Sequence, residues 1–122
     1  MGTAGHAIAI LERISPGGRL LGIDLDPKAI EIAERRLEPY GKAVVLANEN
    51  FRYLEDICTK YDFRPVQGIL FDLGMSLLQL EDSSRGFSFK FDAPLDMRFN
   101  PEQPFTAASL VIPSLSLNLL PF

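Results

Sequence analysis

Apolar residues near the start of the chain recur with the period of a helix. Ile8, Leu11 and Ile14 are each three residues apart, which predicts a helix over residues 7–14. The Ser-Pro-Gly-Gly sequence at residues 15–18 ends it, because proline cannot continue a helix and glycine favours a turn.

Three short apolar runs have the pattern of buried parallel strands. They occupy residues 20–24, 43–47 and 68–72, and the first and the last of them end on an aspartate. Strands of a parallel sheet are covered on both faces, so they are apolar throughout rather than alternating.

Two more helices are predicted between these runs. Asp26 and Pro27 open the first, with aspartate as the N-cap and proline at the first helical position. Glu31 and Arg35 are four residues apart on its exposed side, and residues 51–61 form the second helix. The order of these elements predicts an α/β fold with a doubly wound, mostly parallel sheet.

The pattern changes after the third run. Residues 73–105 are rich in Gly, Ser, Pro, Phe and Asp and show no sustained period, which is typical of a functional or disordered loop. The tail at residues 109–122 has two prolines and no charged residue. We expect residues 1–108 to form one partial domain, followed by an atypical tail.

The sheet is expected to be incomplete. A glycine-rich loop needs a strand that leads into it, yet Met1 directly precedes Gly2. Three strands are also few for a fold of this class, which usually has five or more. The chain therefore looks truncated at both ends, and the missing strand is the one expected at the centre of the sheet.

Composition narrows the class of protein. Apolar residues make up 47% and charged residues 23%, as in a globular domain, and no apolar run approaches the roughly 18 residues of a membrane span. A single cysteine, Cys58, excludes an internal disulfide and fits a reducing, cytoplasmic location. One cysteine and one histidine cannot supply the four ligands of a structural zinc, so we expect no metal.

Candidate binding residues lie where the predicted strands end. Gly5 and His6 come directly before the first helix, where glycine lets a ligand approach the backbone. Asp24 follows Gly5 by 19 positions, the spacing of an acid that holds a ribose diol, although it could also serve as a second capping acid beside Asp26. Asp72 ends the third run and is predicted to face the same crevice, unless it only caps a turn.

Net charge and aromatic residues bear on nucleic-acid binding. The net charge of −4, from 12 basic and 16 acidic residues, does not indicate the basic face typical of phosphate binding. Residues 85–91, Arg-Gly-Phe-Ser-Phe-Lys-Phe, interleave cations with aromatics, and Arg98 and Phe99 follow. This pattern suits contact with single-stranded RNA, but it equally fits core phenylalanines with solvated charges.

Several of these sequences together resemble the MraW-type family of methyltransferases, which modify 16S ribosomal RNA. The similarity covers residues 2–108 and includes Ile-Asp-Leu-Asp-Pro at 23–27 and Asp-Leu-Gly at 72–74. Its most specific part is Arg-Gly-Phe-Ser-Phe at 85–89 followed by Pro-Leu-Asp-Met-Arg at 94–98.

The resemblance implies a Rossmann-like, S-adenosylmethionine-dependent methyltransferase fold, a cytosine N4 in 16S ribosomal RNA of the small subunit as the substrate, and no membrane partner. It also implies the cofactor-binding residues, which are Ala4, Gly5, His6, Asp24, Phe51, Asp72 and Gln79. The catalytic residue is left open, because either Asp72 or Asp96 could polarise the cytosine amine.

The sequence departs from the family pattern at three places. Ala4 stands where the family usually has glycine, Leu77 and Leu78 replace serine and proline before Gln79, and Ala93 replaces glycine. A remnant that binds cofactor or RNA without catalysis remains an alternative. An NAD-dependent oxidoreductase is disfavoured, because the glycines do not complete the G-x-G-x-x-G spacing.

Overall fold

The chain forms two compact units, each described here by itself. A computed structural model describes residues 1–111, and the first unit spans Met1–Gly74, while the second begins at Met75. The helices and strands of the first unit are α1 (Gly5–Ile14), β1 (Leu20–Ile23), α2 (Pro27–Leu37), η1 (Glu38–Ala43), β2 (Val44–Ala47), η2 (Phe51–Tyr53) and α3 (Leu54–Lys60).

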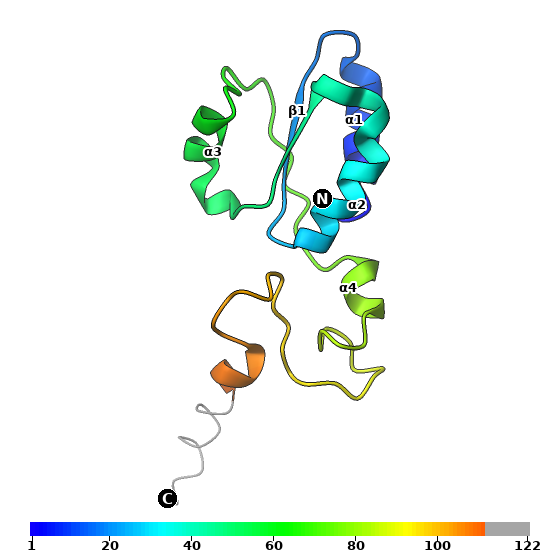
Figure 1. The fold of residues 1–122 in the computed structure, drawn as a ribbon, viewed down its shortest axis with the longest axis vertical. Coiled ribbons are helices and arrows are strands. Elements are labelled where there is room, and N and C mark those ends of the chain that lie inside the picture. Colours follow the sequence, from blue (N-terminus) through cyan, green and yellow to red (C-terminus); the bar gives the residue numbers. More distant parts are fainter. Residues whose placement is uncertain (112–122) are drawn as a thin grey trace, which may run out of the picture. The chain divides into compact units, whose positions relative to one another are not determined.

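The sheet of the first unit confirms a parallel α/β arrangement in a reduced form. β1 and β2 pair in parallel, with Leu20 opposite Val44 and Ile23 opposite Ala47. Helix α2 makes the crossover between them, and α1 and α2 lie on one side of the two strands with α3 on the other (Figure 1). The first two predicted strands and the three predicted helices are therefore present, with shifts of one to three residues at some ends.

The prediction of a third strand at residues 68–72 is wrong. These residues have no strand assignment, and within residues 1–111 the sheet contains only β1 and β2. A strand exists only when its backbone groups pair with a neighbour. The apolar run is present, but among the described residues no backbone hydrogen bond pairs it with another segment.

Local signals account for where α2 begins and how its surface is stabilised. The buried carboxylate of Asp26 accepts a hydrogen bond from the backbone N–H of Lys28 at 3.0 Å, with Pro27 at the first helical position. Arg35 donates to Glu31 one turn earlier. Both predictions made for this helix are confirmed.

The core of the first unit lies between α1 and α2. Leu11 of α1 and Leu37 of α2 are fully buried, and small residues surround them. Ala7 and Ala33 belong to the same cluster, as does Ala4, which precedes α1. Small side chains let the two helices approach closely, so the leucines fill most of the space between them.

The second unit contains α4 (Leu77–Glu81), and residues 107–111 are also helical. Ser76 and Gln79 form a reciprocal capping box at the start of α4. The sequence pattern predicted only an irregular loop at residues 73–105, so α4 was not predicted. Most of the predicted tail at residues 109–122 lies outside the described residues.

An arginine network holds the rest of the second unit together. Arg98 donates to both carboxylate oxygens of Asp96 at 2.8–2.9 Å, and also to the backbone carbonyls of Pro101 and Gln103. Arg85 donates to the carbonyls of Arg98 and Phe99. Each guanidinium thus connects backbone segments that no helix or strand joins.

This network predicts an acid-sensitive second unit. Hydrogen bonds from Arg98 lower the pKa of Asp96 from 3.8 to about 2. Because the folded-state pKa is the lower one, the stabilisation is fully present above about pH 4 and is lost as the pH falls towards 2. The amides of Ala107 and Ala108 bond to the carbonyls of Asp96 and Leu95, so we expect their hydrogen-exchange protection to fall over this range.

A substitution separates this effect from general acid unfolding. In Asp96→Asn the protection of the same two amides should be lower at pH 6 and should vary little between pH 4 and 2. An unaltered pH profile in the variant would contradict the assignment to Asp96.

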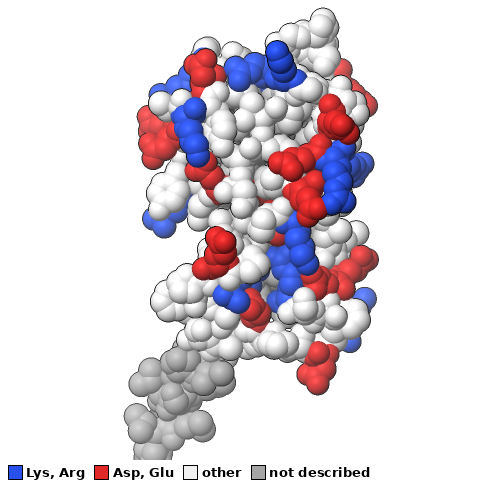
Figure 2. All heavy atoms as spheres, viewed as in Figure 1, with Lys and Arg blue, Asp and Glu red and all other residues white. Residues whose placement is uncertain are grey.

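The surface carries both signs of charge. Figure 2 shows lysine and arginine side chains interspersed with aspartate and glutamate over the drawn face of each unit, without an extended basic area. Within residues 1–111, no helix is long and apolar enough to cross a membrane.

Candidate functional site

The first unit contains an apolar groove between β1 and the segment that follows α3. Its volume is about 250 Å³, and we call it the β1 groove. It is lined by Met1, His6, Ala7, Ile10, Arg19, Leu20, Leu21, Gly22, Ile23, Phe51, Leu54, Cys58, Phe63, Val66, Gly68, Ile69, Leu70, Phe71, Asp72 and Leu73. Three of the seven predicted cofactor-binding residues, His6, Phe51 and Asp72, are among them.

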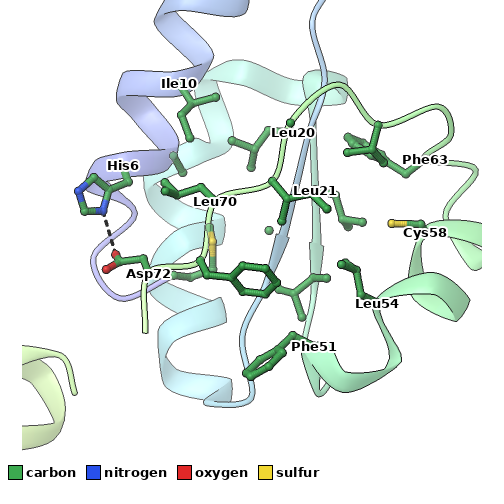
Figure 3. A pocket seen from close by; sticks show the side chains of 18 of the residues that line it. His6, Ile10, Leu20, Leu21, Phe51, Leu54, Cys58, Phe63, Leu70 and Asp72 are labelled. Atoms are coloured by element: carbon green, nitrogen blue, oxygen red, sulfur yellow. Dashed lines mark hydrogen bonds and ion pairs between the residues drawn. The ribbon is translucent and has the colours of Figure 1, made fainter. Parts of the chain in front are cut away.

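His6 and Asp72 meet at the rim of the β1 groove. The His6 Nδ1 atom lies 2.8 Å from Asp72 Oδ2, and both side chains are exposed (Figure 3). The two residues are 66 positions apart, and the spacing of the sequence alone gave His6 no partner. The contact joins the start of α1 to the end of the segment at residues 68–72.

Asp24 lies directly after β1, at the carboxyl end of the strand. Its Oδ1 accepts a hydrogen bond from the Asp26 N–H at 2.9 Å, and its Oδ2 accepts one from the Met1 ammonium at 2.6 Å. Neither interaction is the capping of a helix, since Asp26 caps α2. A carboxylate oxygen can accept two hydrogen bonds, so each oxygen of Asp24 keeps one acceptor site, as a ribose diol with two donors requires.

The loop before α1 has the backbone conformation of a glycine loop. Ala4 is left-handed, with φ of 61°, and its side chain is buried. A left-handed backbone is unfavourable for alanine but not for glycine. This difference explains why glycine is the residue expected at this position from the resemblance to the family. At exposed Gly5, an added Cβ atom would meet no other atom within 4 Å, so the backbone is open to a ligand.

Phe51 stands at the other side of the β1 groove, at the start of η2. Its ring is half exposed and contacts the ring of Phe71 edge to face, with 5.8 Å between centroids. An exposed aromatic face beside an apolar groove suits stacking of a planar ring. The sequence pattern identifies Phe71 only as part of a strand and gives no indication of its contact with Phe51.

Gln79, the seventh predicted residue, belongs to the second unit. Its side chain is buried, and its Oε1 accepts a hydrogen bond from the Ser76 N–H at 2.9 Å. The structure thus gives Gln79 a role in capping α4.

Asn48 is a residue that the sequence analysis missed. It follows β2, and its side-chain Nδ2 donates to the Asp24 carbonyl at 2.9 Å. This bond fixes the two strand ends to each other. The sequence did contain a signal for it. This signal is a polar residue directly after an apolar strand, at the edge where ligands bind in α/β sheets.

The aromatic and basic segment of the second unit divides into two groups. Phe87 is buried and packs against Phe99, with 5.3 Å between centroids, and Arg85 bonds to backbone carbonyls. For these residues the packing interpretation holds. Phe89 is fully exposed, and the adjacent Lys90 is also at the surface. These two residues keep the pattern of an RNA contact.

A known protein family matches the sequence over most of its length. The sequence profile of the MraW methylase family matches residues 1–119. The chain belongs to the MraW methylase family.

Among residues 1–111, no group of three or more His, Cys, Asp or Glu side chains is placed to hold a metal ion.

Similar members of the MraW family are called ribosomal RNA small subunit methyltransferase H. The protein of that name from Dehalococcoides mccartyi is 55% identical over 111 residues, which are 91% of this chain and 32% of the relative. The protein from Desulfosudis oleivorans is 44% identical over 120 residues, covering 98% of this chain and 38% of the relative. The chain spans about a third of the length of these MraW family members.

Proposed function

We propose that residues 1–108 are the cofactor-binding part of an S-adenosylmethionine-dependent methyltransferase that modifies the N4 atom of a cytosine in 16S ribosomal RNA. Membership of the MraW family and the names of its similar members support the methyltransferase class. The observation that carries the proposal is the contact of His6 with Asp72, because it unites the glycine loop with a carboxylate beside the β1 groove.

The residues of the first unit fit an adenosyl cofactor. The open backbone at Gly5 allows close approach, and Asp24 offers two carboxylate oxygens to a ribose diol. The half-exposed ring of Phe51 offers a face to an adenine. When bound, S-adenosylmethionine supplies an electrophilic methyl group on a sulfonium sulfur.

Asp72 is the better placed of the two acids for the cytosine amine. That amine is a weak nucleophile, since its lone pair is delocalised into the ring, and a carboxylate that accepts its hydrogen bond raises its electron density. Asp96 already accepts three hydrogen bonds from Arg98, two from the guanidinium and one from the backbone N–H. Only Oδ2 of Asp72 contacts His6, and we propose that Oδ1 accepts from the amine.

Thermal unfolding of the full chain with candidate ligands tests the cofactor. Ligands that bind only the folded state raise the unfolding temperature by mass action, by about 2.7 kcal/mol of stability at 100 times the Kd. We expect S-adenosylmethionine and S-adenosylhomocysteine to raise the temperature and NAD to leave it unchanged. An equal shift with NAD would contradict the proposal.

Incubation of the chain with methyl-labelled S-adenosylmethionine and small ribosomal subunits tests the reaction. Label in N4-methylcytosine after digestion of the 16S RNA would support methyl transfer. Cofactor-induced stabilisation without label would instead identify the chain as a binding module.

A further inference from the structure

The loop before α1 has a demanding backbone conformation. Gly2 and Ala4 both have positive φ, at 50° and 61°. A backbone hydrogen bond from the Ala4 N–H to the Met1 carbonyl, at 2.8 Å, closes the loop on itself. A left-handed backbone is unfavourable for alanine, so contacts from the surrounding structure must hold this conformation.

Arg36 supplies such a contact from the far end of α2. Its guanidinium donates from Nη1 to the carbonyl of Thr3, 33 positions earlier in the chain. Arg36 lies in the last turn of α2, directly before the buried Leu37. Leu37 belongs to the same core cluster as Ala4, so the end of the helix that carries Arg36 is fixed beside the loop.

The hydrogen bond from Arg36 fixes the orientation of one peptide group. The Thr3 carbonyl and the Ala4 N–H belong to the same planar unit. Arg36 holds this unit at the carbonyl, and the Met1 carbonyl holds it at the N–H. The position of the open backbone at Gly5 follows directly from it, because only the dihedral angles of Ala4 lie between them.

The neighbouring arginine shows that this contact is more than stabilisation of a helix end. Arg35 and Arg36 are both exposed and both lie in the last turn of α2, where a positive charge favours the helix dipole. Arg35 donates to Glu31 of the same helix. The hydrogen bond of Arg36 to Thr3 instead leaves the helix and reaches the loop.

We propose that Arg36 is a positioning residue of the cofactor site, whose hydrogen bond to Thr3 holds residues 2–5 in the conformation that receives the cofactor. This inference rests on the proposed function, because the loop belongs to the site proposed for S-adenosylmethionine. Arg36 acts through the Thr3 carbonyl and need not touch the cofactor. Without the hydrogen bond the loop samples other conformations, and the affinity falls with the fraction that remains competent.

Isothermal titration calorimetry of the full chain measures the effect on affinity. We expect Arg36→Gln to weaken the binding of S-adenosylmethionine by about five- to tenfold, as for a loop that is competent for about 10–20% of the time. Arg36→Lys keeps the charge and a donor, although without the planar fork of arginine, and should weaken binding by only about twofold.

Arg35→Gln is the matched control, because it removes the same charge from the same turn of α2 without touching the loop. We expect it to change the affinity less than twofold. The unfolding temperatures of Arg35→Gln and Arg36→Gln should agree within about 2 °C, since both are surface substitutions. A loss of affinity in Arg36→Gln then reflects the loop rather than the stability of the unit.

NMR relaxation of the ligand-free chain tests the position of the loop without any cofactor. Backbone order parameters are about 0.85 in rigid segments and below about 0.6 in flexible ones. We expect the amides of Ala4 and Gly5 to change from the first range to the second in Arg36→Gln and to remain in the first range in Arg35→Gln.

Three outcomes would overturn the proposal. One is an unchanged affinity in Arg36→Gln, and another is an equal loss of affinity in both glutamine variants, which would indicate an effect of helix charge alone. The third is an unchanged order parameter at Ala4 and Gly5 in Arg36→Gln. Absence of binding to the unaltered chain would contradict the proposed function and the cofactor part of this inference, whereas the order parameters alone decide whether Arg36 holds the loop.

Discussion

Asp24→Asn should weaken the binding of S-adenosylmethionine by about 30–100-fold. Asp24 lies at the carboxyl end of β1, and each of its carboxylate oxygens already accepts one hydrogen bond. Hydrogen bonds to a charged acceptor are worth about 1.5–3 kcal/mol, so loss of the charge and of one acceptor accounts for an effect of this size. Isothermal titration calorimetry measures it directly.

The substitution is chosen to spare the local turn. Asparagine keeps one side-chain oxygen, which can still accept from the Asp26 N–H, whereas alanine would leave this donor without its partner. Asp92→Asn is the matched control, because it removes the same charge from an exposed position in the second unit. We expect it to change the affinity less than twofold. Equal affinities for all three proteins would remove Asp24 from the site.

The parts of the fold that sequence predicted are those with local causes. Asp26 and Pro27 mark the start of α2 because a cap and a fixed φ act within one turn. The capping box of α4 is equally local, with Ser76 and Gln79 three positions apart, and this helix was predictable from that spacing. The segment around it has no sustained apolar period, so the pattern predicted an irregular loop.

The parts that sequence did not predict depend on distant partners. Residues 68–72 carry the pattern of a strand, but pairing depends on two segments, and within residues 1–111 no backbone hydrogen bond joins this run to another one. The contact of His6 with Asp72 spans 66 positions and follows from how the chain returns to the start of α1. The sequence indicated that both residues lie at one crevice, but it gave no reason for them to bond.

The residues of the candidate site differ in how firmly the fold holds them. Asp24, His6 and Phe51 are positioned by β1, α1 and η2, all of which have their own hydrogen bonds. Asp72 stands at the end of the unpaired segment, and its contact with His6 is exposed. The contact with His6 is therefore the one interaction described here that orients the Asp72 carboxylate.

Leu11→Ala should lower the unfolding temperature of the first unit by roughly 12–24 °C. Leu11 is fully buried in the cluster between α1 and α2, where its neighbours Ala4, Ala7 and Ala33 are too small to fill the space it leaves. A leucine-to-alanine change at such a site costs about 3 kcal/mol, and each kcal/mol shifts the midpoint of a small domain by about 4–8 °C.

Leu70→Ala provides the comparison within the same unit. It makes the same chemical change at a side chain that is 61% exposed, so neither a cavity nor much lost burial results. We expect a shift of less than about 3 °C, as is usual for surface substitutions. Circular dichroism at the helical band follows both variants. Similar shifts for the two would mean that α1 and α2 do not form the stabilising core, and that the stability of the first unit resides in the sheet.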